Sequence, residues 1–284
     1  MGVLPGGHWD ERGVLHREFD LAPLTGREEE LLAARGSARP AALVTDVLSR
    51  CVARIGDISP VPPEVTRQLL VADRQYLLLQ LRRATFGDRV RATLTCPWTE
   101  CGERMSVDFS LDAVPVEPPP HRAPHHTATL KDGTEITFRL PTGADQEELS
   151  GHLAVNEAEA LTALLSRCVL RLGGRQPDAE RIAALPAITR LEIEERMRRL
   201  APKVEQTLAA ECAECGRTFV APFDVHRFFL GELRTDATLL YQEVHYLAYH
   251  YHWSESEIMA MTRDKRHTYI DVLAETIEVL NSGA

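Results

Sequence analysis

Residues 94–109 read LTCPWTECGERMSVDF, a pair of cysteines with a glycine directly after the second and an alternating apolar run behind it. Residues 209–223, AAECAECGRTFVAPF, repeat this plan. In both stretches an extended run leads into the cysteines, and Gly102 or Gly216 follows the second one. Glycine tolerates the left-handed backbone conformation that is needed where a knuckle turns back into a strand. The repeated plan therefore predicts two β-hairpins with a cysteine pair at each tip.

The four cysteines have the spacing of a structural zinc site. Four residues separate Cys96 from Cys101, and two separate Cys212 from Cys215, both within the range found in zinc knuckles. Two hairpins that face one another would offer four thiolates in a tetrahedron. Because four protein ligands leave no open coordination position, the expected cofactor is a Zn²⁺ ion that is structural and not hydrolytic.

Other interpretations of the thiols remain open. The two pairs can be unrelated, or the CAEC at residues 212–215 can be a redox motif. A thioredoxin-like motif opens a helix after a strand, whereas CGRTFVAPF has the pattern of a strand, which disfavours the redox interpretation. Cys51 and Cys168 lie on apolar faces of expected helices without partners at ligand spacing, and we expect both to be buried thiols.

Hydrophobic patterning predicts an α+β fold that is mainly helical, with the four-cysteine zinc ribbon split by a small inserted domain. The expected organisation is an N-terminal helical region at 1–85, the split ribbon at 86–112 and 203–225, an inserted hairpin-plus-helices domain at 127–200, and a C-terminal helical hairpin at 226–284. Within these regions helices are expected over about 41–55, 64–84, 145–171 and 187–200.

Local motifs refine this scheme. Asp132-Gly133 between two alternating runs predicts a hairpin. Thr25 with Glu28 has the spacing of a capping box at the start of a helix. Residues 113–126 are rich in proline and histidine and are expected to form a linker, with three solvated histidines, His121, His125 and His126.

Composition limits the classes of function. The chain has 284 residues, of which 44% are hydrophobic and 26% charged, as in a globular protein. Its net charge of −10 argues against nucleic acid as the main partner. No apolar run is long enough for a membrane span, and the first residues lack the pattern of a signal peptide. We therefore expect a cytoplasmic protein, in which cysteines serve as metal ligands or free thiols.

The C-terminal part is rich in aromatic residues. A helix is expected to stop near residue 251, and Ser254 with Glu257 makes a second capping box where the next helix starts. Packing explains part of the aromatic content, and a partner-binding surface is the alternative, with Trp98, Tyr249, His252 and Trp253 as the candidate residues.

Catalytic motifs are missing from the sequence. It contains no phosphate-binding glycine loop, nucleophile elbow or paired-histidine zinc helix, so an enzyme is not expected. The helix–turn–helix pattern near the C-terminus suggests DNA binding, but residues 253–284 hold three bases and six acids, and a recognition helix should be electropositive. A helical hairpin for protein contact is favoured.

Four segments occur in an order that is found in a known family: LLVADRQYLLLQLRRATFGDRV, CPWTECG, CAECGRTFVAPFDVHRFFLGEL and HYLAYHYHWSESEIMAMTRDKRHTYIDVL. They resemble the zinc-ribbon baseplate proteins of contractile phage tails and phage-tail-like contractile injection systems, which are described as baseplate hub subunits or hub assembly chaperones. The last segment is also similar to the C-terminal helices of phage tail assembly chaperones. The resemblance covers about residues 65–110 and 203–275.

The resemblance implies a non-enzymatic assembly factor or minor subunit of a baseplate, with other baseplate or tail proteins as partners. Such a protein would be cytoplasmic or incorporated in an assembled particle. It implies no catalytic residues, and only the four cysteine ligands carry over. The alternative from another class is a zinc-ribbon or helix-turn-helix regulator that binds nucleic acid.

Overall fold

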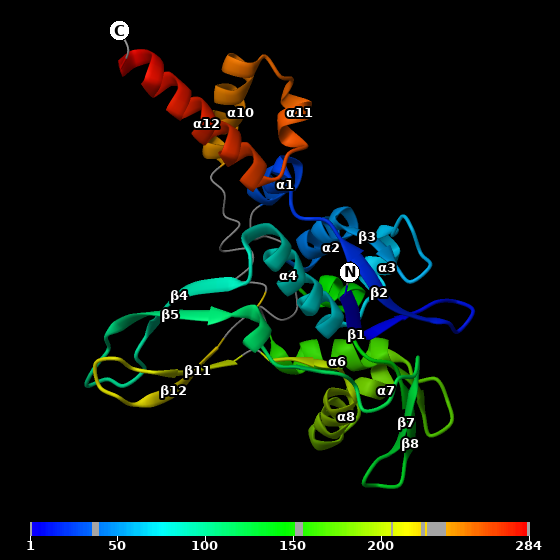
Figure 1. Ribbon diagram of the computed structural model, residues 1–284. Coiled ribbons are helices and arrows are strands. Elements are labelled where there is room, and N and C mark those ends of the chain that lie inside the picture. The colour runs from blue at the N-terminus through cyan, green and yellow to red at the C-terminus, as the bar shows by residue number, and fades with distance from the viewer. Residues whose placement is uncertain are drawn as a thin grey trace. The chain divides into compact units, whose positions relative to one another are not determined.

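The computed structural model of the chain describes residues 2–35, 40–150, 156–205, 207–222, 225 and 237–282. The chain divides into two compact units of three segments each (Figure 1). Unit 1 consists of Met1–Asp20, Arg39–Leu77 and Val114–Glu205, and unit 2 consists of Leu21–Ala38, Leu78–Ala113 and Gln206–Ala284. Both units contain helices and strands, which agrees with the expected α+β class.

The N-terminal part of unit 1 contains a three-stranded sheet that the sequence patterns did not reveal. Its strands are β1 (Gly2–Trp9), β2 (Leu15–Leu21) and β3 (Val52–Ile55), in the order β1-β2-β3. The N-terminal region, which was expected to be helical, thus also contains three strands. The helix expected over 41–55 also ends early, because α2 (Pro40–Cys51) gives way to β3, in which both terminal residues are buried.

The helix expected over 64–84 is two helices, α3 (Pro63–Gln68) and α4 (Val71–Phe86). The break has a hydrogen-bonding cause. Leu69 is extended, and its carbonyl accepts a bond from Gly143 N at 3.0 Å, while Val71 N donates to the Pro141 carbonyl at 3.3 Å. Backbone groups of a neighbouring loop thus replace the intrahelical bonds at this point.

A second three-stranded sheet lies in the region where an inserted domain was expected. It has the order β7-β8-β9, and the hairpin predicted at Asp132-Gly133 is confirmed, with Gly133 at a φ of 85°. The elements are β7 (His126–Thr129), β8 (Glu135–Phe138), α5 (Gly143–Leu149), α6 (Glu157–Cys168), β9 (Val169–Leu172), α7 (Ala179–Ala183) and α8 (Ala187–Leu200). The helix predicted over 187–200 is confirmed, whereas the one over 145–171 is α5 and α6 followed by a strand. Phe138, Leu165 and Ile193 are fully buried in the shared core.

A short antiparallel pair connects the two ends of this region. β6 (Val116–Glu117) pairs with β10 (Lys203–Val204), with Val116 opposite Val204. The stretch expected to be a linker thus contains a strand, and a short 3-10 turn (Leu111–Ala113) precedes it. The chain leaves for the β7-β8-β9 region and returns from it through adjacent strands.

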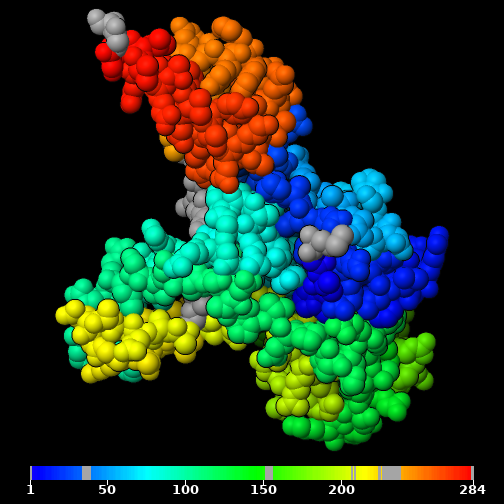
Figure 2. Space-filling model, in the orientation of Figure 1, coloured from blue at the N-terminus to red at the C-terminus, as the bar shows by residue number. Residues whose placement is uncertain are grey.

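Unit 2 contains two separate hairpins and a group of helices. The hairpins are β4 (Arg89–Thr95) with β5 (Arg104–Ser110), and β11 (Thr207–Glu211) with β12 (Thr218–Pro222), both antiparallel. The two predicted hairpins are therefore present. In the space-filling view they lie beside one another, green and yellow (Figure 2).

The C-terminal helices number three among the described residues, and not the two of a simple hairpin. They are α10 (Ala237–Tyr251), α11 (Glu255–Met259) and α12 (Arg263–Ser282). His252 has a φ of 57° and ends α10, and Ser254 and Glu257 form the predicted capping box of α11. The second break is caused by α1 (Gly26–Arg35), because Gly26 N bonds to the Met261 carbonyl at 3.2 Å. The expected helical residues 230–236 lie outside the described residues.

A buried arginine ties these helices together. Arg266 on α12 is fully buried, and its guanidinium donates to Glu29 on α1 at 2.8 Å and to Glu243 on α10 at 3.0 Å. At the start of α1, Glu28 accepts bonds from the backbone N–H and the hydroxyl of Thr25, as the predicted capping pair should. Among the helices that the structure describes, none is both long and apolar enough to cross a bilayer.

Candidate metal centre

The two cysteine hairpins of unit 2 have the same backbone plan. Cys96 N bonds to the Glu103 carbonyl at 2.9 Å, and Cys212 N bonds to the Arg217 carbonyl at 3.0 Å, so each first cysteine stands at the base of a tight loop. The glycine after each second cysteine is left-handed, with φ of 64° at Gly102 and 67° at Gly216. A side chain at these two positions would be strained, which explains why glycine occupies both.

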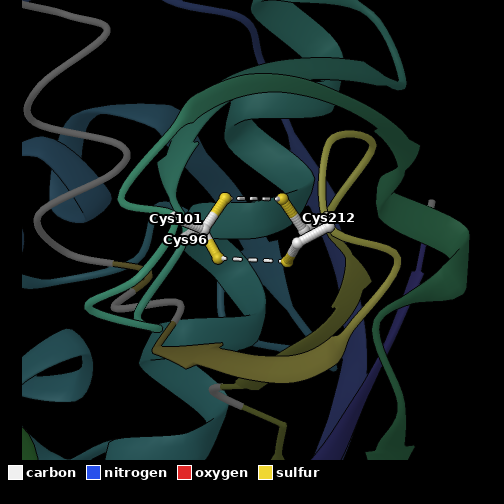
Figure 3. Close-up of side chains that lie close together, drawn as sticks. Cys96, Cys101 and Cys212 are labelled. Atoms are coloured by element: carbon white, nitrogen blue, oxygen red, sulfur yellow. Dashed lines mark hydrogen bonds between the residues drawn. The ribbon is translucent and has the colours of Figure 1, made fainter.

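The four sulfur atoms form a compact cluster. All of them lie within 4.8 Å of one another. The first cysteine of each hairpin faces the second of the other, with Sγ–Sγ distances of 3.9 Å for Cys96–Cys215 and 3.7 Å for Cys101–Cys212 (Figure 3). These distances are too long for disulfides, whose sulfurs are about 2.05 Å apart.

The dimensions of the cluster fit a metal ion with thiolate ligands. A tetrahedral Zn²⁺ site with bonds of about 2.3 Å places its sulfurs about 3.8 Å apart. The two measured Sγ–Sγ separations, 3.7 and 3.9 Å, lie on either side of this value. Within the described ranges, these four cysteines are the group of His, Cys, Asp or Glu side chains whose ligand atoms converge in this way.

The electrostatics of the cluster also favour a cation. Hydrogen bonds from the backbone N–H groups of Cys215 and Glu214 lower the pKa of Cys212 to about 7, so one thiolate forms readily. At Cys101 a bond from the Glu103 backbone acts in the same direction, but burial and the neighbouring thiols raise its pKa to about 12. Four adjacent thiolates repel one another, so a positive ion at the centre is what allows all four to ionise together.

The sequence of residues 14–230 matches the profile of a family described as T4 bacteriophage base plate protein. The chain belongs to this family. The match includes both cysteine hairpins and the β7-β8-β9 region, where the sequence motifs had shown little resemblance, and it ends before α10. No curated protein and no solved structure matches the chain.

In this baseplate-family chain the two hairpins also contact each other beside the sulfurs. Arg217 on the second hairpin forms an ion pair with Glu100 on the first at 3.1 Å, and its guanidinium lies 5.3 Å from the centre of the Trp98 ring. Trp98, a candidate partner residue, is 41% exposed and partly covered by this contact. The sequence alone did not reveal the pair, because its residues are far apart in the chain.

The other candidate partner residues have different surroundings. Tyr249 is exposed on α10, and His252 is the exposed residue that ends this helix. Trp253 instead stacks on Tyr251 with ring centres 4.5 Å apart and contacts Tyr269, so much of its surface is used inside the protein. Among these residues, Tyr249 thus presents the most open aromatic ring.

The remaining cysteines and histidines of interest lie in unit 1. Cys51 and Cys168 are buried, as expected. The expectation for the proline-rich stretch was wrong at His126, which starts β7 and is 7% exposed, packed 5.8 Å from the Phe138 ring. The alternation of β7 points His126 to the core side, a pattern that the neighbouring prolines had obscured.

Proposed function

We propose that this protein is a non-enzymatic assembly factor or minor subunit of the baseplate of a contractile phage tail or contractile injection system, stabilised by one structural Zn²⁺ ion. The family match over residues 14–230 carries the proposal, because it includes both hairpins that would hold the ion. Other baseplate or tail proteins would be the partners, and the protein would act in the cytoplasm or within the assembled particle.

The proposed zinc site would act as a clasp. Cys96, Cys101, Cys212 and Cys215 would hold the ion, and their hairpins contribute few buried apolar side chains of their own. Metal binding to such small ribbons supplies on the order of 10 kcal/mol of folding free energy. The bound ion would therefore fix two segments, 111 positions apart in the chain, in one conformation.

The C-terminal half of α12 offers a contact surface for a partner. Four apolar residues follow one another at spacings of three, four and three, the pattern of a helix that packs along another helix: Ile270, Leu273, Ile277 and Leu280. Leu280 is 69% exposed, whereas the other three are half-buried. Residues 268–282 carry three acidic side chains and no basic one, which favours a partner helix flanked by lysine or arginine.

Deleting the gene in its native phage or injection system tests the proposal. We expect loss of mature, contractile particles and recovery of the tagged protein with baseplate or tail-tube proteins from the cytosol. Mass spectrometry of purified particles distinguishes a retained subunit from a released assembly factor. Normal assembly and firing without the protein would contradict the proposal, and salt-dependent DNA binding by the purified protein would favour a nucleic-acid regulator instead.

A further inference from the structure

A cavity of about 430 Å³ is lined entirely by residues of unit 1. The backbone of Gly6 and Gly7 on β1 forms one side of it, the proline-rich segment 119–126 another, and residues 139–144 a third. The glycines leave room there, since a Cβ on Gly6 would lie 2.7 Å from the Leu70 side chain. The Asp73 carboxylate holds this bend of β1 by accepting both glycine N–H groups, at 2.8 and 2.9 Å.

The lining of this cavity is rich in cationic and proton-donating side chains. Six residues supply them: His8, His121, Arg122, His125, His126 and Arg139. No aspartate or glutamate is among the described residues that line it, although the chain as a whole has a net charge of −10. Such a local reversal of charge creates a positive potential in a recess, which favours anions.

Some of these groups are already engaged and others are not. Arg139 forms an ion pair with Asp145 at 2.6 Å, so its charge is largely compensated. Among the described residues, the guanidinium of Arg122 makes a long hydrogen bond of 3.5 Å to the Pro5 carbonyl and interacts electrostatically with the Asp73 carboxylate. His126 is 93% buried, and its Nε2 atom has no hydrogen-bond partner among the described residues. A buried ring nitrogen without a hydrogen-bond partner destabilises the folded state, unless a bound molecule supplies the missing hydrogen bond.

We propose that this cavity binds an oxyanion, either a small carboxylate or phosphate compound or an acidic side chain of a partner protein. Arg122 supplies the charge, and the ring nitrogen of His126 supplies a buried hydrogen bond. The side-chain amide of Gln68, which also lines the cavity, supplies a further donor. The site is independent of the proposed baseplate function, since it rests on side chains of unit 1 alone.

Calorimetric titration of the full-length, zinc-loaded protein tests the site with three probes at constant ionic strength. The probes are sodium phosphate, sodium succinate and the capped peptide acetyl-Glu-Glu-Glu-amide. We expect at least one to bind the wild-type protein, and Arg122→Gln to weaken that binding roughly tenfold or more, because a charge-assisted bond is lost. His126→Phe keeps the packing on Phe138 but removes the ring nitrogens, and should weaken binding as well.

Arg175→Gln is the matched control, because Arg175 is an exposed arginine of the same unit that does not line the cavity. It should bind the probe as the wild type does, and zinc content should be equal in all variants. Binding of the peptide alone identifies an acidic side chain as the ligand, and binding of phosphate or succinate identifies a small anion. Absence of binding of all three probes at about 10 mM, or wild-type affinity in Arg122→Gln, would overturn the proposal.

Discussion

Single side chains decide whether the two hairpins act as one site. The four thiols occupy equivalent places at the tips, but their hydrogen bonds differ. The backbone around Cys212 favours its thiolate, whereas burial and neighbouring thiols keep Cys101 protonated until a cation arrives. Removing any one of the four cysteine ligands should therefore weaken metal binding by the whole site.

Cys212→Ser should lose the bound metal. We expect about one zinc per chain in the purified wild-type protein and a small fraction of that in the variant, because serine is a poor zinc ligand at neutral pH. Inductively coupled plasma mass spectrometry of the dialysed protein measures this directly. Cys51→Ala, which removes a buried thiol outside the cluster, is the control and should keep its zinc. Equal metal content in both variants would refute the four-cysteine site.

Arg266 should be the residue in unit 2 whose charge matters most for stability. Replacing it by methionine leaves Glu29, which is 1% exposed, and Glu243 without their shared cation. Breaking a buried ion pair in this way costs about 3–5 kcal/mol. Chemical denaturation followed by circular dichroism should show the loss for Arg266→Met and little change for Lys265→Met, at an exposed position beside it. Similar values for the two variants would show that the buried network is not stabilising.

Asp73 should make the stability of unit 1 depend on pH. Burial raises its pKa from 3.8 to about 6, against the opposing effect of the Gly6 and Gly7 N–H bonds. The folded state therefore holds the proton more tightly than the unfolded chain, and the free energy of unfolding falls by about 3 kcal/mol as pH rises from about 4 to about 6. In Asp73→Asn this part of the fall should be absent, and in the exposed-site control Asp264→Asn it should remain. Parallel pH profiles of the free energy of unfolding for the wild type and Asp73→Asn would contradict this role of Asp73.

At the scale of elements, two helix breaks coincide with hydrogen bonds to neighbouring backbone that the local sequence does not reveal. Leu69 breaks the α3–α4 helix because a loop offers competing hydrogen bonds, and α1 does the same between α11 and α12. α12 then extends past these contacts, with Leu273 and Ile277 half-buried and Leu280 exposed. A helix whose apolar stripe is only partly buried within its own chain is well suited to bind a partner helix.

Ile277→Glu should abolish capture of baseplate partners by the tagged protein. The change places a charge in the middle of the apolar stripe, where burial against a partner helix would be costly. Because Ile277 is only half-buried in the free protein, the thermal unfolding temperature should change little. Thr276→Glu, at an exposed adjacent position, is the control for added charge. Undiminished capture by Ile277→Glu would exclude this surface.

At the scale of the whole molecule, the proposed zinc site couples the stabilities of two hairpins that are far apart in the chain. Chelation should raise amide hydrogen exchange in β4–β5 and β11–β12 together, because each hairpin loses the same ion. Exchange in α8, which belongs to the other unit and packs in its own apolar core, should stay unchanged. Mass-spectrometric exchange with and without chelator measures both, and a response in one hairpin only would argue against a shared ion.

The sequence predicted the parts of this molecule whose signals are local. The hairpins, their cysteines and glycines, the hairpin at Asp132-Gly133 and the helix over 187–200 all follow from short patterns. β1 was missed because its turn-like glycines are held by Asp73, far along the chain. The burial of His126 and the pairing of Arg266 were missed for the same reason, since each depends on contacts that only the folded chain creates.

The β6–β10 ladder changes the entropy of closing the zinc site. Without it, the ion would have to close a loop of about 110 residues between Cys101 and Cys212. With Val116 and Val204 already paired, only about 20 residues remain in that loop, which lowers the closure cost by about 1.5 kcal/mol. Folding of the region between the hairpins should thereby strengthen zinc binding about tenfold, so the metal is retained most firmly by chains that have finished folding elsewhere.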